Sequence, residues 1–398
     1  MKTRLWIALS ACCLLLPDSS FAAAKVGQSC ALTGPTALLG KEMAKGARLY
    51  FEKRAAGEIE LITKDDGYEP DLCRQNTAAF IRDGALALFG YLGTPTAKAA
   101  VPMANENKTV FFGAGTGADF LSDPAANPYS FALRASYGAE IENMMRRLHE
   151  DLGIKKISLF VQRDSFGLVG VVGAVKALDK IKGMEIVPPV PPIPSEEAGV
   201  DEWNAFWSSV PNYKRNTVSV GGAVRQVRGN AAEAVILVGT ARPCALAINQ
   251  WHKMGYKAPM INISFVGSKA LAERLTESGN VYVSQVVPDP WDSSLPIVKQ
   301  YQQDMGEAAA DYDFGGFEAY LAASVLHQAV KNVQGEVSSD AVKTALEGMS
   351  NYDAGGIAVS FGPEDRRGMD KVYLTKVEKD GGTAKFVYVD KLIKAEKK

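Results

Sequence analysis

Six short stretches that combine hydroxyl side chains with glycine are the residues of this sequence best suited to chemistry. Each follows a predicted strand, and the stretches lie at residues 33–35, 93–96, 113–117, 164–167, 239–241 and 264–267. Such loops can hold a small polar ligand through Oγ atoms and bare amide N–H groups. Ser and Thr are also ordinary helix N-caps, so any single loop has a purely structural explanation as well.

Motifs for cofactor or metal chemistry are weak. Residues 113–118 fit the GxGxxA dinucleotide fingerprint, but they follow the fourth predicted strand, and no acidic residue ends a strand about 20 positions later. The three histidines, His149, His252 and His327, are far apart, and no HExxH, CxxC or GxSxG motif occurs. We therefore expect a protein that is not an enzyme, with no cofactor and no metal site.

The elements that must position these loops alternate between strands and helices. In the first stretch, strands are predicted at 25–28, 58–63, 85–89 and 109–112, with helices at 40–55, 71–83 and 96–105. The pattern restarts with a helix at 139–152, strands at 156–161, 234–238, 259–263 and 281–286, helices at 167–180, 243–254 and 268–276, and later helices at 295–305 and 317–333. This order predicts an α/β protein with two Rossmann-like, doubly wound parallel-sheet lobes. The length of 398 residues also favours two domains.

The N-terminus has the anatomy of a secretory signal peptide over residues 1–22. A positive start precedes an apolar run and a small-x-small site, with cleavage expected after Ala22 or, second, after Ala24. Residues 9–12 also match a bacterial lipoprotein box, which leaves lipid anchoring at Cys12 as the alternative to export into the periplasm. The apolar run continues past Cys12, which argues against that anchor. No later segment is long and apolar enough to cross a membrane.

Charge and cysteine usage extend this interpretation. A net charge of −1 provides no field for holding nucleic acid or an anionic membrane. An exported chain meets an oxidising compartment, where one disulfide is expected. Cys30 and Cys73 follow the ends of predicted neighbouring strands, so we predict that they pair. Cys244 lies in an apolar helix and is interpreted as a buried filler.

Three runs in order, GQSCALTGP at 27–35, DDGYEP at 65–70 and FGYLGT at 89–94, together with FGP at 361–363, resemble the type I periplasmic binding proteins. The nearest group is the leucine/isoleucine/valine-binding family that serves ABC importers. The resemblance implies two lobes joined by three hinge crossings, near residues 134–137, 286–289 and 369–372. The N-terminal lobe would comprise 25–134 with 287–371, and the C-terminal lobe 135–286 with 372–398.

The resemblance also implies a ligand site between the lobes. In the N-terminal lobe, Thr94 matches the hydroxyl and backbone N–H that hold an α-carboxylate. Ala114 and Thr116 match the carbonyl and the threonine that hold the ammonium and support the carboxylate. These three positions keep the chemistry of the family.

The C-terminal lobe departs from the family pattern. Phe166 matches the aromatic residue that covers the ligand, Thr240 matches a second family tyrosine, and Ser264 replaces the acidic residue that neutralises the ammonium. Leu39 replaces an aromatic residue of the first loop. A buried ammonium without a counter-charge is costly, so an α-amino acid ligand needs a carboxylate from elsewhere.

Three acidic residues are candidates for that role: Asp164, Asp289 and Glu318. Each also has a plain interpretation as a helix cap or a solvated surface residue. Trp291, just beyond the second crossing, can stack on a ligand or simply fill the hinge.

These observations predict an exported solute-binding protein. It would capture a small polar or carboxylated ligand, such as an amino acid or an organic acid, and deliver it to the membrane permease of an ABC transporter. A ligand-sensing receptor for a membrane histidine kinase is the alternative, and a secreted enzyme on the same fold comes third. A nucleic-acid partner and integral membrane insertion are not expected.

Overall fold

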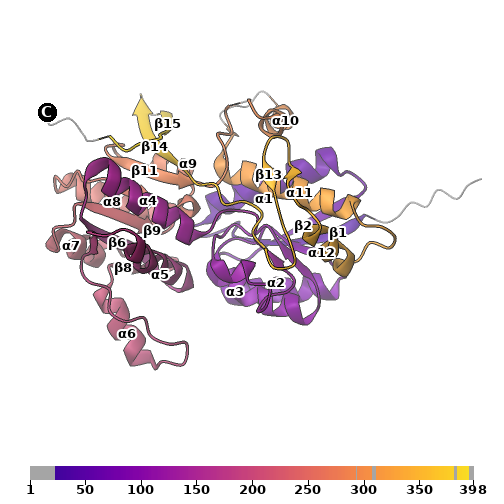
Figure 1. Ribbon diagram of the computed structural model, residues 1–398, viewed down its shortest axis with the longest axis horizontal. Coiled ribbons are helices and arrows are strands. Elements are labelled where there is room, and N and C mark those ends of the chain that lie inside the picture. The colour runs from indigo at the N-terminus through magenta and orange to yellow at the C-terminus, as the bar shows by residue number, and fades with distance from the viewer. Residues whose placement is uncertain (1–22, 293, 307–310, 381–382, 394–398) are drawn as a thin grey trace, which may run out of the picture.

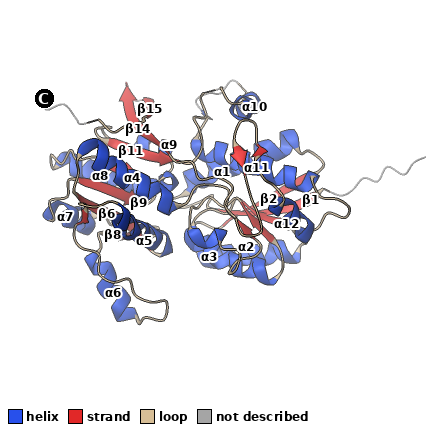
Figure 2. Cartoon of the chain, viewed as in Figure 1, coloured by secondary structure: helices blue, strands red, loops and turns tan. Residues whose placement is uncertain are grey.

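The computed structural model describes residues 23–292, 294–306, 311–380 and 383–393, and shows two α/β lobes side by side (Figure 1, Figure 2). The predicted signal peptide, residues 1–22, lies outside the described residues. The first lobe contains β1 (Ala24–Cys30), α1 (Ala37–Arg54), β2 (Ile59–Asp65), α2 (Pro70–Arg82), β3 (Ala87–Phe89), α3 (Thr94–Glu106), β4 (Val110–Phe112), the 3-10 helix η1 (Asp119–Ser122), β5 (Ser130–Phe131), α10 (Pro296–Met305), α11 (Phe314–Lys331), α12 (Ser339–Glu347), β12 (Tyr352–Asp353) and β13 (Ala358–Val359).

The second lobe is formed by the middle of the chain and a C-terminal hairpin. Its elements are α4 (Tyr137–Leu152), β6 (Lys156–Arg163), α5 (Ser165–Lys180), β7 (Glu185–Ile186), α6 (Val200–Ser209), β8 (Asn212–Lys214), α7 (Gly221–Gly229), β9 (Ala234–Val238), α8 (Ala241–Lys253), β10 (Met260–Asn262), the 3-10 helix η2 (Ser264–Val266), α9 (Ser268–Arg274), β11 (Val281–Gln285), β14 (Tyr373–Asp380) and β15 (Thr383–Tyr388).

The sheet of the first lobe is parallel, with strand order β2-β1-β3-β4-β5. Successive side chains of a strand point to opposite faces, and β3 shows this directly. Ala87 and Phe89 belong to the core on the α1 and α11 face, whereas Leu88 packs with residues of α2 and α3. Burial on both faces explains why this strand reads as a continuous apolar run.

The sheet of the second lobe has the order β15-β14-β11-β10-β9-β6-β7, with β8 also paired to β6. The strands from β6 to β11 are parallel, but β14 pairs antiparallel with β11 and with β15. The predicted α/β fold class is confirmed. The hairpin was not expected, because its sequence is rich in charged residues and only a minority of its side chains, such as Leu374 and Val377, are buried.

The chain passes between the lobes three times. It does so between β5 and α4, between β11 and α10, and between β13 and β14. The predicted crossings near 286–289 and 369–372 fall within two of these connections, and the one near 134–137 overlaps the first connection and the first residue of α4. Each lobe is consequently assembled from two separate stretches of chain, and the exact lobe boundaries stay a prediction.

The predicted disulfide between Cys30 and Cys73 is wrong in this structure, where Cys30, Cys73 and Cys244 are all free and buried. Cys30 packs on the α1 face of the first sheet, and its thiol donates to the Gly40 carbonyl at 3.2 Å. Cys73 packs on the α2 and α3 face, and its thiol donates to the Thr96 carbonyl at 3.4 Å. The two cysteines are near in strand order but lie in cores on opposite faces of the sheet.

We expect that protein lacking residues 1–22, unfolded in denaturant without a reductant, reacts with three equivalents of a thiol reagent such as DTNB. The native protein should react slowly, because burial raises the pKa of all three thiols and hides the thiolate nucleophile. Recovery of a single reactive thiol after unfolding would contradict this arrangement.

Candidate functional site

Two threonine hydroxyls meet at the edge of the first lobe that faces the second. Thr94 is the first residue of α3, and Thr116 lies in the loop after β4. Their Oγ1 atoms are 2.8 Å apart, and both side chains are fully buried. The neighbouring Ala114 is also buried, and its carbonyl accepts a hydrogen bond from the Thr116 N–H at 2.8 Å. The structure therefore brings together the three positions predicted in this lobe.

A glycine turn allows this approach. Gly93, which precedes Thr94, has a φ of +95°, and a Cβ there would lie 2.2 Å from the ring of Tyr68. Only glycine combines that backbone with such close ring contact. Tyr68 is fully buried and so covers the start of α3.

Four aromatic rings fill the space between the lobes: Tyr68, Tyr137, Phe166 and Phe265, called here the interlobe aromatic layer. Phe166 and Phe265 have ring centroids 4.6 Å apart, Tyr137 and Phe166 5.4 Å, and Tyr68 and Phe265 5.9 Å. The Gln162 side chain, at the end of β6, donates to the Tyr68 hydroxyl at 3.3 Å. Phe166, predicted as a covering aromatic residue, is thus part of the contact between the lobes. Among the residues that the structure describes, none makes a hydrogen bond to the buried hydroxyl of Tyr137.

A buried arginine at the first crossing links the lobes electrostatically. The Arg134 guanidinium lies 2.9 Å from Glu140 Oε1 and 3.3 Å from Glu318 Oε1, and it also donates to the Ser264 hydroxyl. Glu140 belongs to α4, Glu318 to α11, and Ser264 begins η2. Side chains from both lobes therefore converge on one cation at the first crossing.

Glu140 supplies the carboxylate that Ser264 lacks. Its two oxygens accept hydrogen bonds from the Ser264 N–H and Oγ, each at 2.9 Å, and from the Ser284 hydroxyl. The acidic group at this position thus comes from α4 and not from the loop after β10. The negative charge of Glu140 is already compensated by its ion pair with Arg134.

Glu318, one of the acidic residues singled out in the sequence, does reach this network. Burial raises the pKa of its carboxyl, and the neighbouring Arg134 only partly offsets this. Burial acts against the charge of Arg134 as well, but Glu318 and Glu140 outweigh it and raise the guanidinium pKa. Charges buried in this way depend on one another for compensation.

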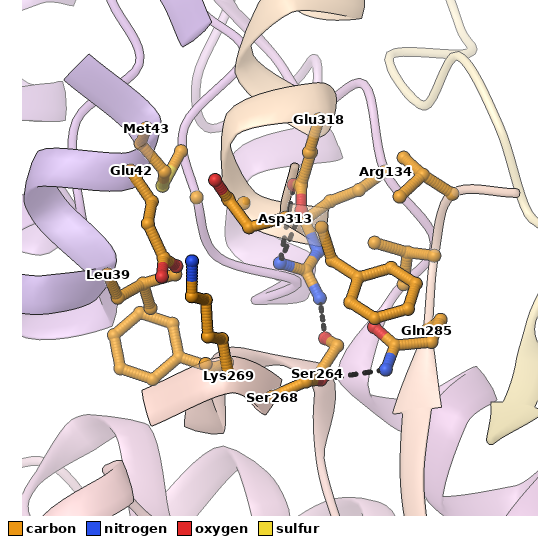
Figure 3. A pocket seen from close by; sticks show the side chains of 17 residues that line it. Leu39, Glu42, Met43, Arg134, Ser264, Ser268, Lys269, Gln285, Asp313 and Glu318 are labelled. Atoms are coloured by element: carbon orange, nitrogen blue, oxygen red, sulfur yellow. Dashed lines mark hydrogen bonds and ion pairs between the residues drawn. The ribbon is translucent and has the colours of Figure 1, made fainter. Parts of the chain in front are cut away.

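A small cavity lies beside this network, between α1, the start of α11, and the segment from η2 to α9 (Figure 3). Its open volume is about 20 Å³, roughly the room of one water molecule. Arg134, Glu318 and Ser264 line one part of it. Glu42, Asp313 and Lys269 line the other part, and Figure 3 shows the Lys269 ammonium pointing toward the Glu42 carboxylate.

The remaining predicted residues lie elsewhere. Thr240 is the N-cap of α8, and its N–H and Oγ1 contact the Tyr213 hydroxyl at 2.9 Å and 3.4 Å. It lines a second pocket, where residues 34–39 of the first lobe face residues of the second lobe. Thr240 therefore also lies where the lobes meet, as Ser264 and Phe166 do, but among the described residues it makes no hydrogen bond to Thr94 or Thr116.

The other acidic candidates have local roles. Asp164 caps α5 by accepting from the N–H groups of Phe166 and Gly167. Asp289 accepts from the backbone N–H of Trp291 at 2.9 Å. Trp291 packs at 5.4 Å from Phe314 in one lobe and at 6.0 Å from Phe386 in the other, as a residue that fills the hinge would do.

Contacts at the rim also hold the lobes together. Glu69, before α2, pairs with Arg215 at 2.8 Å and accepts from the Asn216 side chain at 2.6 Å. The same Asn216 amide donates to the Gly67 carbonyl at 3.3 Å. Arg215 and Asn216 follow β8 in the second lobe, whereas Gly67 and Glu69 belong to the first lobe. The rim is therefore closed by polar contacts, and breaking them in water costs little free energy.

The residues missed by sequence reasoning are mainly charged: Arg134, Glu140, Glu42 and Asp313. Arg134 lies at the predicted first crossing, which was the available signal that it faces both lobes. Glu140 follows an N-cap serine, Ser136, by four residues and looks like an ordinary first-turn acid. Among the described residues, no group of three or more metal-binding side chains occurs, and no helix has the length and apolar character needed to span a bilayer.

Comparisons with known proteins agree with this architecture. A family model described as periplasmic binding protein matches residues 23–382. A solved structure described as a possible leucine/isoleucine/valine-binding protein from Rhodopirellula baltica SH 1 has 31% identity and a TM-score of 0.79, and the match covers 92% of this chain and 96% of that one.

Two further structures extend the likeness. A substrate-binding periplasmic protein from Ralstonia solanacearum has 25% identity and a TM-score of 0.76, with 92% of this chain and 100% of that one covered. A leucine-binding protein from Thermotoga maritima MSB8 has 15% identity and a TM-score of 0.73, covers 92% and 97%, and shows a shared fold alone. A search of curated protein sequences gave no match. The match over residues 23–382 and the two-lobed architecture show that this chain belongs to the periplasmic binding protein family.

Proposed function

We propose that the protein is an exported solute-binding protein that takes up a small polar or carboxylated solute between its lobes and delivers it to an ABC transporter permease. The observation that carries this proposal is the pair of buried hydroxyls, Thr94 and Thr116, at the first-lobe side of a contact that also buries Arg134. Buried polar groups of this kind are costly unless they are hydrogen-bonded. The loop of Thr116 lies beside the first crossing, since the Gly117 carbonyl accepts from the Tyr137 N–H at 2.8 Å, and a hinged protein can hold a ligand next to such a crossing.

Access to this site requires the lobes to separate. A cavity of about 20 Å³ is far too small for an amino acid or an organic acid. The rim contacts of Glu69 with Arg215 and Asn216, and the contact of Tyr68 with Gln162, would break on opening and form again on closing. Closure excludes water and so strengthens the hydrogen bonds that orient the solute.

The chemistry of the site favours a solute with a carboxylate or another hydrogen-bonding head group. Hydroxyls and the N–H groups at the start of α3 suit an anionic group, because the N-terminus of a helix carries unpaired donors and a partial positive charge. The printed description of the Rhodopirellula baltica structure, at 31% identity, names branched-chain amino acids and supports this class of solute.

The test begins with the mature chain and a thermal-shift screen against the standard amino acids and short dicarboxylic and hydroxycarboxylic acids. A solute that binds only the folded state raises Tm. Calorimetry then gives the affinity for each positive compound. A chain that binds none of these solutes, and carries no small molecule after native mass spectrometry, would contradict the proposal.

Thr94→Ala and Thr116→Ala are each expected to weaken binding of the identified solute by about 1–3 kcal/mol, because a buried solute group loses its partner. Calorimetry on the mature protein measures this loss. The matched control is Thr276→Ala, an exposed threonine of the second lobe, which should leave the affinity unchanged. Unaltered affinity in both cleft variants would remove these threonines from the site.

A further inference from the structure

Strand β2 forms an outer edge of the first-lobe sheet. Among the residues that the structure describes, β1 is its single neighbouring strand. Such an edge offers a row of unpaired N–H and C=O groups to another chain. A hollow of about 410 Å³ lies beside the strand, lined in part by Arg48 of α1 and Leu61 of β2, so α1 does not cover this end of the sheet.

The backbone groups of β2 divide between the two sides of the strand. Just before β2, the Glu58 carbonyl accepts from the first residue of β1 at 2.8 Å, and just after it the Asp66 N–H donates to the last residue of β1 at 3.2 Å. The even-numbered residues of this stretch therefore face β1, and the odd-numbered ones point away from it. Within the described chain, no group donates to or accepts from the backbone of Leu61 or Thr63 on that outer side.

The sequence of β2 is self-complementary about Ile62. In an antiparallel pair of two copies with a twofold axis at this residue, Leu61 lies opposite Thr63 of the second copy. Both residues point outward, so they can exchange both N–H···O bonds on each side of the axis. Glu60 then lies opposite Lys64 of the second copy, in a non-hydrogen-bonded pair where side chains approach most closely and opposite charges attract.

The charged side chains lie on one face of the strand. The Lys64 Nζ is 5.0 Å from the centre of the Phe80 ring, and Ile62 packs against the same core under α2 and α3. Side chains alternate along a strand, which puts Glu60 on this face as well. Neither Glu60 nor Lys64 forms an ion pair with any described residue, and Glu60 is exposed. Their pattern favours an identical strand over one that would place like charges opposite them.

We propose that the protein associates with a second copy of itself through β2, in an antiparallel pair centred on Ile62 that joins the two first-lobe sheets into one. This association is separate from solute binding and does not depend on it. The carboxyl ends of the two sheets point in opposite directions in such a pair, so the second lobes lie at opposite ends of the dimer. The lobes of each copy can then still separate.

The experiment is sedimentation velocity at low salt on protein lacking residues 1–22, from about 1 μM to 1 mM. The sedimentation coefficient should rise with concentration toward that of a dimer. Lys64→Glu places like charges opposite each other on both sides of the axis, and so does Glu60→Lys. Each variant should weaken association by about 10-fold or more. The double variant Glu60→Lys with Lys64→Glu restores both pairs with their signs exchanged and should recover the affinity of the natural sequence.

A control and a second measurement guard against effects on folding. Lys182→Glu makes the same change of charge at an exposed loop residue of the second lobe and should leave association unchanged. Thermal unfolding confirms that each variant is folded. Hydrogen exchange at residue resolution needs no variant: the amides of Leu61 and Thr63 should gain protection as concentration rises. The amides of Ile62 and Lys64, which face β1, should be protected at every concentration.

The outcomes decide the proposal in either direction. A dimer that is lost in each single variant and regained in the double variant, with new protection at Leu61 and Thr63, supports it. A protein that stays monomeric at 1 mM contradicts it. Association that survives Lys64→Glu, or that leaves the Leu61 and Thr63 amides unprotected, uses another surface and overturns it equally.

Discussion

Replacing Arg134 by methionine is expected to lower the free energy of unfolding by about 3–5 kcal/mol, because it leaves two buried carboxylates without their shared cation. Arg134 is 3% exposed and contacts Glu140 at 2.9 Å and Glu318 at 3.3 Å. Chemical denaturation of protein lacking residues 1–22 measures the loss.

Two further variants isolate the electrostatic cause. Adding Glu140→Gln and Glu318→Gln to Arg134→Met should recover much of the lost stability, since no unpaired charge then remains buried. Arg146→Met removes an exposed pair with Glu150, at 3.2 Å on the surface of α4, and should change stability by less than about 0.5 kcal/mol. A loss below 1 kcal/mol on Arg134→Met would mean that the network contributes little to the fold.

Gly46→Ala is expected to destabilise the first lobe by about 3 kcal/mol, the upper end of the cost of overpacking. A Cβ at Gly46 in α1 would lie 1.9 Å from the carbonyl oxygen of Gly316 in α11. Backbone on both sides of the contact cannot move aside as a flexible side chain would. The clash therefore exceeds the roughly 1 kcal/mol that alanine normally gains over glycine in a helix.

The same substitution at Gly222 is the control. Gly222 lies in α7, and a Cβ there meets nothing within 4 Å. Gly222→Ala should leave stability unchanged or raise it slightly, as measured by the same denaturation. Equal effects at the two glycines would show that the approach of α1 to α11 is looser than the structure indicates.

The fold was predictable because its signals are local. The apolar run that ends at Phe89 and the loops that carry Thr94 and Thr116 each report directly on a strand and the turn after it. The parallel architecture then places those loops at one edge. This topology brings Thr94 and Thr116 to the same edge, and the turn at Gly93 then allows their hydroxyls to meet.

The charged half of the site was not predictable in the same way. Arg134 and Glu140 read as surface residues, since nothing local indicates that helices from both lobes will cover them. The pairing of Cys30 with Cys73 failed for a related reason. Strand order indicated proximity, but the face of the sheet on which each thiol lies depends on side-chain alternation and on how α2 packs.

Because the chain passes between the lobes three times, each lobe needs segments from distant parts of the sequence before it can fold completely. Helix α11, which covers the sheet of the first lobe, begins at Phe314, long after that sheet ends at Phe131. The second lobe receives its last strand pair only at Tyr373–Tyr388. A polypeptide that is made and threaded from its N-terminus therefore cannot finish either half early, because large apolar faces stay uncovered until almost the whole length has emerged. Delayed completion of this kind is compatible with the proposed export, in which the chain would cross the membrane unfolded and fold afterwards.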